Sequence, residues 1–311
     1  MRRPTTRTII LTVTLSASVL LGACAIPPAP AVVATPCVIA PENVLSWAKF
    51  GTLEERPLPY AEAYSGCGKT LVYVAAEHGN DPGSETYRLV SQSFADARPD
   101  FVVLEGFPFE MGISPEALRD YAAEVAGTPG DAEPYFAVRL AQAAGVAFVG
   151  GEPTDAAVVA AATRAGMSAA DVFGYYIVRL IPQWMRSETL SAADDERLDT
   201  EIRSYAAQFA EDADIDISAL ADVDTIDTFK AWYSAKNGLD FQTGYRPEDA
   251  WPSGALPDPR VTNRLADIVS DAREQHIVSV IAGAVEKHNT VLVVYGGSHH
   301  LVQAPAFEKA F

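Results

Sequence analysis

The stretch TLVYVAAEHGND, residues 70–81, begins as an apolar run that is typical of a buried strand and then places Glu77 and His78 side by side. Burying a carboxylate and an imidazole costs free energy unless the two groups are paired or hydrogen-bonded. We therefore expect the pair to stand at the end of the strand, where it reaches water or takes part in chemistry.

Short β-rich runs alternate with longer helical patterns along the chain. The expected strands are 70–76, 100–106, 145–153 and 290–300, and the helices between the first three are 84–98, 115–126 and 134–144. This alternation predicts parallel strands joined by crossover helices. We expect four strands in one sheet, and an α/β fold with a mostly parallel central sheet flanked by helices.

An additional helical block interrupts the alternation near residues 155–238. Its expected helices are 155–165, 169–186, 192–212 and 224–236, with Gly238 as a stop signal. Residues 240–260 form a loop by their Pro, Gly and Asp content, and a long helix over 261–288 leads into the last strand. Because nothing in the interior resembles a linker, we expect residues 37–311 to form a single domain.

Residues 1–23 have the features of an export signal: arginines at the start, an apolar run and small residues before a cysteine. The ending Leu21-Gly22-Ala23-Cys24 resembles a bacterial lipobox, which implies cleavage before Cys24 and a lipid on its thiol. An ordinary secretory signal is the alternative. Residues 24–36 then form an Ala/Pro-rich tether. We expect a lipid-anchored protein of the bacterial envelope. Ala25, and not Asp, follows the cysteine, and the resemblance to sorted lipoproteins implies the periplasmic face of the outer membrane.

Two further cysteines, Cys37 and Cys67, remain in the expected mature chain. In an oxidising envelope such a pair is more often a disulfide than a redox or metal site. The bond would clamp residues 38–66 onto the core.

The chain is strongly acidic, with a formal net charge of −18. The expected signal contains three of the 23 basic residues and none of the 41 acidic ones, so its removal makes the protein still more acidic. This charge excludes nucleic acid as a partner. A small molecule or a peptide is the expected substrate.

Carboxylates and imidazoles follow all four expected strands. Glu77 and His78 end the first, Glu105 the second, Glu152 the third, and His299 and His300 the fourth. The carboxyl ends of parallel strands lie at one edge of the sheet, which is where ligands bind. We therefore expect a shared polar site there; the alternative is that polar residues merely mark where each strand leaves the core.

Four segments carry a resemblance to a known family: VAAEHGN (74–80), FVVLEGFP (101–108), REQHIVSVI (273–281) and VLVVYGGSHH (291–300). In this order they resemble the superfamily of TraB/Tiki proteins and erythromycin-esterase/ChaN-like proteins. The resemblance implies site residues Glu77, His78, Glu105, the Arg273–Glu274 pair and Gly296 to His299. It also implies a hydrolase, either a metal-dependent peptidase or an esterase-like enzyme, or else a haem-binding lipoprotein.

Two enzyme chemistries fit these residues. In the first, His78, His299 and one or two of Glu77, Glu105 and Glu152 hold a divalent metal, Zn or Mn, that activates a water molecule. In the second, His78 is the general base, Glu105 orients it, and Arg273 stabilises the oxyanion. His300 is the weaker candidate of its pair because neighbours in extended backbone point to opposite faces.

Two non-hydrolytic alternatives stay open. Phe107, Phe109, Tyr175, Tyr176 and Trp184 could wall the site, and a Tyr or His ligand to haem iron would make the protein a haem-binding lipoprotein. A non-catalytic interaction module is the other alternative. SGCGKT (65–70) ends like a phosphate-binding loop, but Ala63 replaces the first required glycine and the segment precedes a strand, so we reject that motif.

Overall fold

The computed structural model describes residues 37–186 and 195–311, and one compact unit, Thr35–Phe311, contains all of them. The expected signal over 1–23, the lipidated Cys24 and the tether over 24–36 lie outside the described residues. No helix in the described part of the chain is both long enough and apolar enough to span a membrane.

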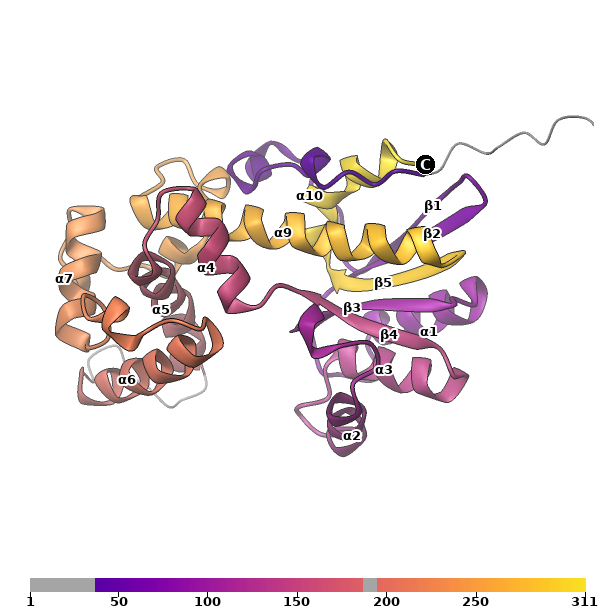
Figure 1. Ribbon diagram of the computed structural model, residues 1–311, viewed down its shortest axis with the longest axis horizontal. Helices are drawn as coiled ribbons and strands as arrows, with labels where there is room; N and C mark the ends of the chain where they lie inside the picture. Colours follow the sequence, from indigo (N-terminus) through magenta and orange to yellow (C-terminus); the bar gives the residue numbers. More distant parts are fainter. Residues whose placement is uncertain (1–36, 187–194) are drawn as a thin grey trace, which may run out of the picture. The chain divides into compact units, whose positions relative to one another are not determined.

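Within the described residues, the centre of the fold is a five-stranded sheet in the order β1-β2-β5-β3-β4 (Figure 1). The strands are β1 (Tyr60–Gly66), β2 (Lys69–Ala76), β3 (Phe101–Pro108), β4 (Ala147–Glu152) and β5 (Thr290–Gly296). β2, β5, β3 and β4 are parallel, and β1 is antiparallel to β2. The expected α/β class with a mostly parallel sheet is confirmed, whereas the expected number of four strands is wrong.

The strand that the sequence did not predict, β1, forms a hairpin with β2 at the edge of the sheet. Its turn is Cys67-Gly68, with φ of 54° and 77°. Positive φ at both positions is what a two-residue type I′ turn requires. The phosphate-loop-like letters SGCGKT are therefore the tip of a hairpin. β1 was missed because most of its side chains are only partly buried or exposed.

Most expected helices are present within a few residues. They are α1 (Glu85–Ala97), α2 (Glu116–Glu124), α3 (Glu133–Ala144), α4 (Asp155–Arg164), α5 (Ala169–Arg186), α6 (Asp195–Asp212), α7 (Ile226–Asn237), α8 (Phe241–Gly244), α9 (Val261–Lys287) and α10 (Gly297–Glu308). Gly238 ends α7 in the left-handed conformation that its lack of a Cβ permits. The expected loop over 240–260 contains the short helix α8, and the expected start of α6 at residue 192 lies outside the described residues.

The last expected strand was too long. β5 ends at Gly296, and Gly297 begins α10, so His299 and His300 lie in a helix and not in extended backbone. The helix was missed because its first residues are glycines, a serine and histidines, and it contains Pro305. A proline in a helix removes a backbone donor, and glycine is a poor helix former.

Two layers of helices cover the sheet. On one face, Ile277 and Ile281 of α9 and Phe307 of α10 pack against the strands. On the other face, Val90 of α1 and Val138 of α3 pack against the alternate strand residues. Strand side chains alternate between these two cores, as the pleat of a strand requires. Figure 1 shows the helical block, α4 to α8, beside this sandwich, with α9 running from the block to the sheet.

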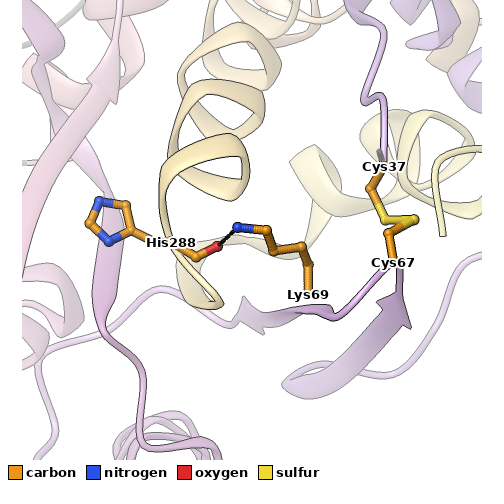
Figure 2. The surroundings of a disulfide bond; sticks show 4 residues. All are labelled: Cys37, Cys67, Lys69 and His288. Atoms are coloured by element: carbon orange, nitrogen blue, oxygen red, sulfur yellow. Dashed lines mark hydrogen bonds between the residues drawn. A yellow bond between two sulfur atoms is a disulfide. The ribbon is translucent and has the colours of Figure 1, made fainter. Parts of the chain in front are cut away.

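Cys37 and Cys67 form the expected disulfide, with their Cα atoms 5.7 Å apart (Figure 2). The bond ties the segment before β1 to the turn of the β1–β2 hairpin. Next to the turn, Lys69 Nζ donates a hydrogen bond to the carbonyl of His288 at 2.9 Å. The amino-terminal segment continues to Trp47, whose backbone N–H donates to Asp271 of α9 at 2.7 Å. Disulfide and hydrogen bonds together hold this segment against the core.

Candidate functional site

The carboxyl edge of the sheet brings together residues from five separate segments. His78 follows β2, Glu105 lies in β3, Glu152 ends β4, and His299 lies in the first turn of α10 after β5. Arg273 reaches the same edge from α9. The closest atoms of consecutive members of this cluster are 2.5 to 3.7 Å apart. These predicted residues therefore form one continuous polar cluster.

His78 is oriented by a residue that sequence reasoning missed, Glu133 in the first turn of α3. Its Nδ1 lies 2.5 Å from Glu133 Oε1, whereas its Nε2 lies 3.7 Å from Glu105 Oε2. Glu133 is 3% exposed at its side chain, while the His78 side chain is 60% exposed. The hydrogen bond to Glu133 raises the pKa of His78 above its ordinary value. We expected Glu105 to orient His78, but the side chain that forms a hydrogen bond with the His78 ring is Glu133.

No signal in the sequence distinguishes Glu133 from an ordinary helix start. An acidic residue in the first turn is common because it interacts favourably with the helix dipole, and Pro134 follows it at a position where proline is tolerated. Only the packing of α3 against the sheet turns this carboxylate toward His78.

Glu105 is held as an ionised carboxylate between β3 and β5. Its Oε2 accepts the backbone N–H of Gly296 at 2.7 Å. Burial by itself raises the pKa of a carboxyl, but the charges of His299 and Arg273 outweigh burial and hold the pKa of Glu105 well below its usual range. Gly106, with φ of 100°, allows β3 to turn at this point in a conformation open mainly to glycine. The site therefore contains a permanent hydrogen-bond acceptor beside His78.

Gly296 makes room for His78. Ala76, the last residue of β2, pairs with Gly296, so the chain after β2 passes directly over the end of β5. A Cβ at Gly296 would lie 2.6 Å from His78 Nε2. Real Cβ contacts of that length are essentially never observed, so the glycine is required for this position of the ring.

Arg273 neutralises two partly buried carboxylates of the cluster, Glu105 and Glu152. Its Nε and Nη2 donate to both oxygens of Glu152, at 2.5 and 2.7 Å, and Nη2 also donates to Glu105 Oε1 at 3.2 Å. Bidentate pairs of this kind fix the geometry of both partners. Burial lowers the pKa of an arginine, but Glu152 and Glu105 outweigh it and raise the pKa of Arg273 above its usual value. Arg273 is therefore a fixed positive charge.

His299 is held from both sides. Its Nδ1 lies 2.5 Å from Glu274 Oε1, and its Nε2 lies 3.1 Å from Arg273 Nη1. Because an arginine can only donate, this contact corresponds to a neutral ring whose Nε2 accepts. Burial alone lowers the pKa of His299, but Glu274 and Glu105 outweigh it and raise the pKa to about 9. At pH 7 the ring therefore carries a second proton; its Nε2–H then faces Glu105 Oε1 at 3.4 Å, and the contact with Arg273 is no longer a hydrogen bond.

Glu274 is fully buried behind His299. Its second oxygen accepts from Gln303 Nε2 at 2.6 Å, and Trp47 Nε1 donates to Oε1 at 3.2 Å. Tyr73 donates in turn to Gln303 Oε1 at 3.1 Å. Among the described residues, the hydrogen bond to His299 is the one that links Glu274 to the cluster, so Glu274 holds that ring in place.

His300 lies outside the cluster. Its two ring nitrogens are hydrogen-bonded to the hydroxyls of Tyr60 and Tyr64, at 2.8 and 2.9 Å. Burial lowers the pKa of His300 to about 4, so the ring is neutral at pH 7. The preference for His299 over His300 agrees with this placement, although both lie in a helix and not in extended backbone as we expected.

Glu77 is not drawn into the cluster. It is exposed, and its backbone N–H and carbonyl pair with the hydroxyl of Thr86 in α1. Within the described residues, no contact of the Glu77 carboxylate with a member of the cluster is found. The two adjacent residues therefore differ: His78 belongs to the site, whereas Glu77 faces water.

The residues do not fit the expected divalent metal. Glu105, Glu152 and His299 all hydrogen-bond to Arg273, so a guanidinium occupies the place that a cation would need. A metal would have to displace this cation or lie beside it. No group of three or more His, Cys, Asp or Glu side chains in the described ranges is arranged to hold a metal ion.

The aromatic residues considered for haem do not converge on the cluster. Tyr175 is buried, and its hydroxyl donates to the carbonyl of Ala250 at 3.3 Å. Tyr176 and Trp184 pack against the core of the helical block, and Phe107 belongs to the core on the opposite face of the sheet from α9. Phe109 is 42% exposed. Within the described residues, neither Tyr175 nor Tyr176 forms a hydrogen bond with a member of the cluster.

Comparisons of the chain with protein-family models, with curated proteins and with solved structures find no match. We therefore infer function from the chemistry of the cluster, His78, Glu105, Glu152, Arg273 and His299, and of Glu133, which binds His78.

Proposed function

We propose that this protein is a metal-independent hydrolase of ester, amide or peptide bonds, in which His78 is the general base that activates water. The observation that carries the proposal is the pairing of an exposed imidazole with a buried carboxylate. Glu133 fixes Nδ1 of His78 at 2.5 Å, so Nε2 is the nitrogen that can take a proton. A histidine oriented by a carboxylate in this way is a common arrangement for general-base catalysis.

The water that reacts would lie between His78 and Glu105. The 3.7 Å between Nε2 and Oε2 is too long for a direct hydrogen bond, and both atoms are acceptors when the ring is neutral. One water can donate a hydrogen to each of them. The lone pairs of the water oxygen then point away from His78 and Glu105. They face the side from which solvent, and therefore a substrate, reaches His78. As the water attacks a carbonyl carbon, its proton passes to Nε2, and Glu133 and Glu105 stabilise the imidazolium.

Arg273 contributes positive charge next to the reacting groups. Three of its five N–H groups are accounted for by Glu105 and Glu152 within the described residues, which leaves the two on Nη1 when His299 is protonated. These N–H groups can stabilise the negative oxygen that forms as water adds to a carbonyl. His299, with its raised pKa, is a second source of positive charge and can deliver a proton to the leaving group.

The test is hydrolysis of a panel of p-nitrophenyl esters and p-nitroanilides by the metal-stripped protein. We expect activity to survive exhaustive dialysis against a chelator. His78→Ala should lower kcat by about 10²- to 10⁴-fold, the range typical of a lost general base. Gly296→Ala is a second variant that tests the position of the ring, because the added Cβ would displace the His78 ring without removing it.

Two controls separate a catalytic loss from unfolding. His78 is largely exposed, so His78→Ala should leave the melting temperature nearly unchanged. Glu77→Ala removes the neighbouring carboxylate, which lies outside the cluster, and should leave the rate unchanged. Full activity in His78→Ala would contradict the proposal, and so would activity that is lost on chelation and restored by zinc or manganese.

We further propose that the enzyme is a lipoprotein of the bacterial envelope, anchored through Cys24 and acting on a small-molecule or peptide substrate. The lipobox-like Leu21-Gly22-Ala23-Cys24 and the Ala/Pro-rich tether support the anchor. The Cys37–Cys67 disulfide supports an oxidising compartment, because such bonds are rare in the cytosol.

A further inference from the structure

A hollow lies away from the polar cluster, between strands β3 and β4 and helix α9. Its volume is about 260 Å³, just below the usual range of small-molecule sites, which begins at about 300 Å³. Phe101, Val149, Val280 and Ala284 contribute apolar walls. Phe101 is the first residue of β3, at the opposite end of that strand from the polar cluster.

The outer rim of this hollow is also apolar. Phe109 and Ile113 line it and are 42% and 61% exposed. The segment that carries them is fixed to the edge of the sheet, because the N–H of Ser114 donates to the carbonyl of Phe148 in β4 at 2.7 Å. Two large apolar side chains are therefore held in water beside an apolar hollow, where a ligand could cover them.

Three nitrogen-bearing side chains also line the hollow: His276, Lys287 and His288. The Nε2 of His276 is buried and has no hydrogen-bond partner among the described residues. Because this atom is closed to solvent, a ligand in the hollow does not reach it, and Lys287 is the group that can meet a ligand's charge. Lys287 is exposed, and no ion pair of its ammonium is found in the described part of the chain.

The surroundings make these groups selective for a negative charge. The carbonyl of His288 is bound by Lys69, and Figure 2 shows its imidazole on the side away from that lysine. The His288 ring stacks on Phe101 with ring centroids 4.3 Å apart. Among the residues that the structure describes, no Asp or Glu side chain lines the hollow, although the chain as a whole has a net charge of −18. An apolar hollow with an exposed lysine and no carboxylate among its described lining residues is complementary to an anion with a hydrocarbon tail.

We infer that this hollow binds a medium-chain aliphatic carboxylate. The hydrocarbon chain lies against Phe101, Val149 and Val280, and the carboxylate pairs with the exposed ammonium of Lys287. This site is separate from the proposed hydrolase site and does not depend on it.

The probe is octanoate, titrated by isothermal calorimetry into the full chain carrying Cys24→Ser, which needs no detergent that would compete for the hollow. We expect saturable binding with one site. Removing methylenes, in hexanoate and butanoate, should weaken binding by up to about fourfold for each methylene. Octylamine, with the same chain and a positive head group, should bind at least tenfold more weakly.

Gly283 supplies the sharpest variant. It lines the hollow, and a Cβ built on it meets no atom within 4 Å. Gly283→Leu should fill the hollow and weaken octanoate binding at least tenfold, while Gly283→Ala, the size control, should bind nearly as well as wild type. Both are helix substitutions by better helix formers, so the melting temperature should not fall.

A second pair tests the charge. Lys287→Gln should weaken octanoate binding several-fold, whereas Lys49→Gln, an exposed lysine elsewhere in the chain, should not change it. Three results would overturn the inference: no saturable binding of octanoate by the folded protein, equal binding of octylamine, or undiminished binding by folded Gly283→Leu. Hydrolysis by Gly283→Leu should stay at the wild-type rate, which separates this site from the catalytic one.

Discussion

His299 and His300 are adjacent in the first turn of α10, yet the first is hydrogen-bonded to the carboxylate of Glu274 and the second to the hydroxyls of two tyrosines. The two environments move their pKa values in opposite directions. Glu274 and Glu105 overcome burial and raise the pKa of His299 to about 9, whereas burial lowers the pKa of His300 to about 4. One turn of helix therefore presents one imidazole to the charged cluster and one to the core.

His300 should make the protein less stable in mild acid. Its folded pKa lies below the ordinary value of about 6.5, so the unfolded chain binds more protons between pH 6.5 and 4. The stabilisation is present above pH 6.5 and is lost as the pH falls toward 4, with a magnitude on the order of 3 kcal/mol. Urea unfolding at a series of pH values should show a shallower acid slope in His300→Gln. His288→Gln is the control, and an equal slope in His300→Gln would contradict the assignment.

Glu133 should set the pH profile of hydrolysis. A general base must be deprotonated, so activity should rise with pH through the pKa of His78, which the hydrogen bond to Glu133 raises. Glu133→Gln removes that effect. We expect a lower kcat and an acidic limb that moves to lower pH. Glu133→Asp, which keeps the charge, should retain more of the wild-type profile. A lower kcat with an unmoved limb would mean that Glu133 acts only through structure.

Glu274 should matter for stability more than any other carboxylate of the site. It is fully buried and bonded to His299, Gln303 and Trp47. Glu274→Ala leaves these partners unsatisfied in the interior, and we expect a loss of about 3 to 5 kcal/mol in the free energy of unfolding. The exposed Glu77 is the matched control, and Glu77→Ala should change stability by less than about 0.5 kcal/mol. Similar values for the two variants would exclude a structural role for Glu274.

The disulfide should stabilise the amino-terminal segment. Opening the loop between Cys37 and Cys67, with a sequence separation of 30, should cost about 3 to 4 kcal/mol in the chain-entropy model. The double variant Cys37→Ser/Cys67→Ser should therefore melt at a lower temperature than wild type. Because Trp47 follows this segment and binds Glu274, we also expect faster exchange of the Trp47 indole N–H by NMR. Two free thiols in the oxidised wild type would contradict the bond.

Cys24 should decide where the protein is found. In a bacterial host, the wild-type chain should partition into the detergent phase and incorporate radiolabelled palmitate. Cys24→Ser should do neither, because the expected acceptor thiol is missing. The matched control is the Cys37→Ser/Cys67→Ser variant, which should keep both properties. Unchanged partitioning of Cys24→Ser would refute the lipid anchor.

Local patterns in the sequence determined the types and positions of most elements. The apolar runs at the start of the segments 70–76 and 290–300 predicted buried strands, although the second strand ends at Gly296, and the stop signal at Gly238 marked the end of α7. Since such patterns depend on residues a few positions apart, they can be recognised in the sequence without knowledge of the tertiary fold. The convergence of Glu105, Glu152 and His299 also followed from the sequence, because parallel strands must end at one edge.

Partners that are distant in the sequence were decided only by the tertiary structure. Glu133 is 55 residues from His78, and before α3 packs on the sheet nothing separates it from any acid that begins a helix. Likewise, Arg273 looked like an oxyanion donor, but the fold surrounds its guanidinium with Glu105 and Glu152, so most of its hydrogen-bonding capacity holds the site together. The sequence sets which charges are available; the packing of α3 and α9 against the sheet fixes which of them meet, because electrostatic partners are chosen by distance in space and not along the chain.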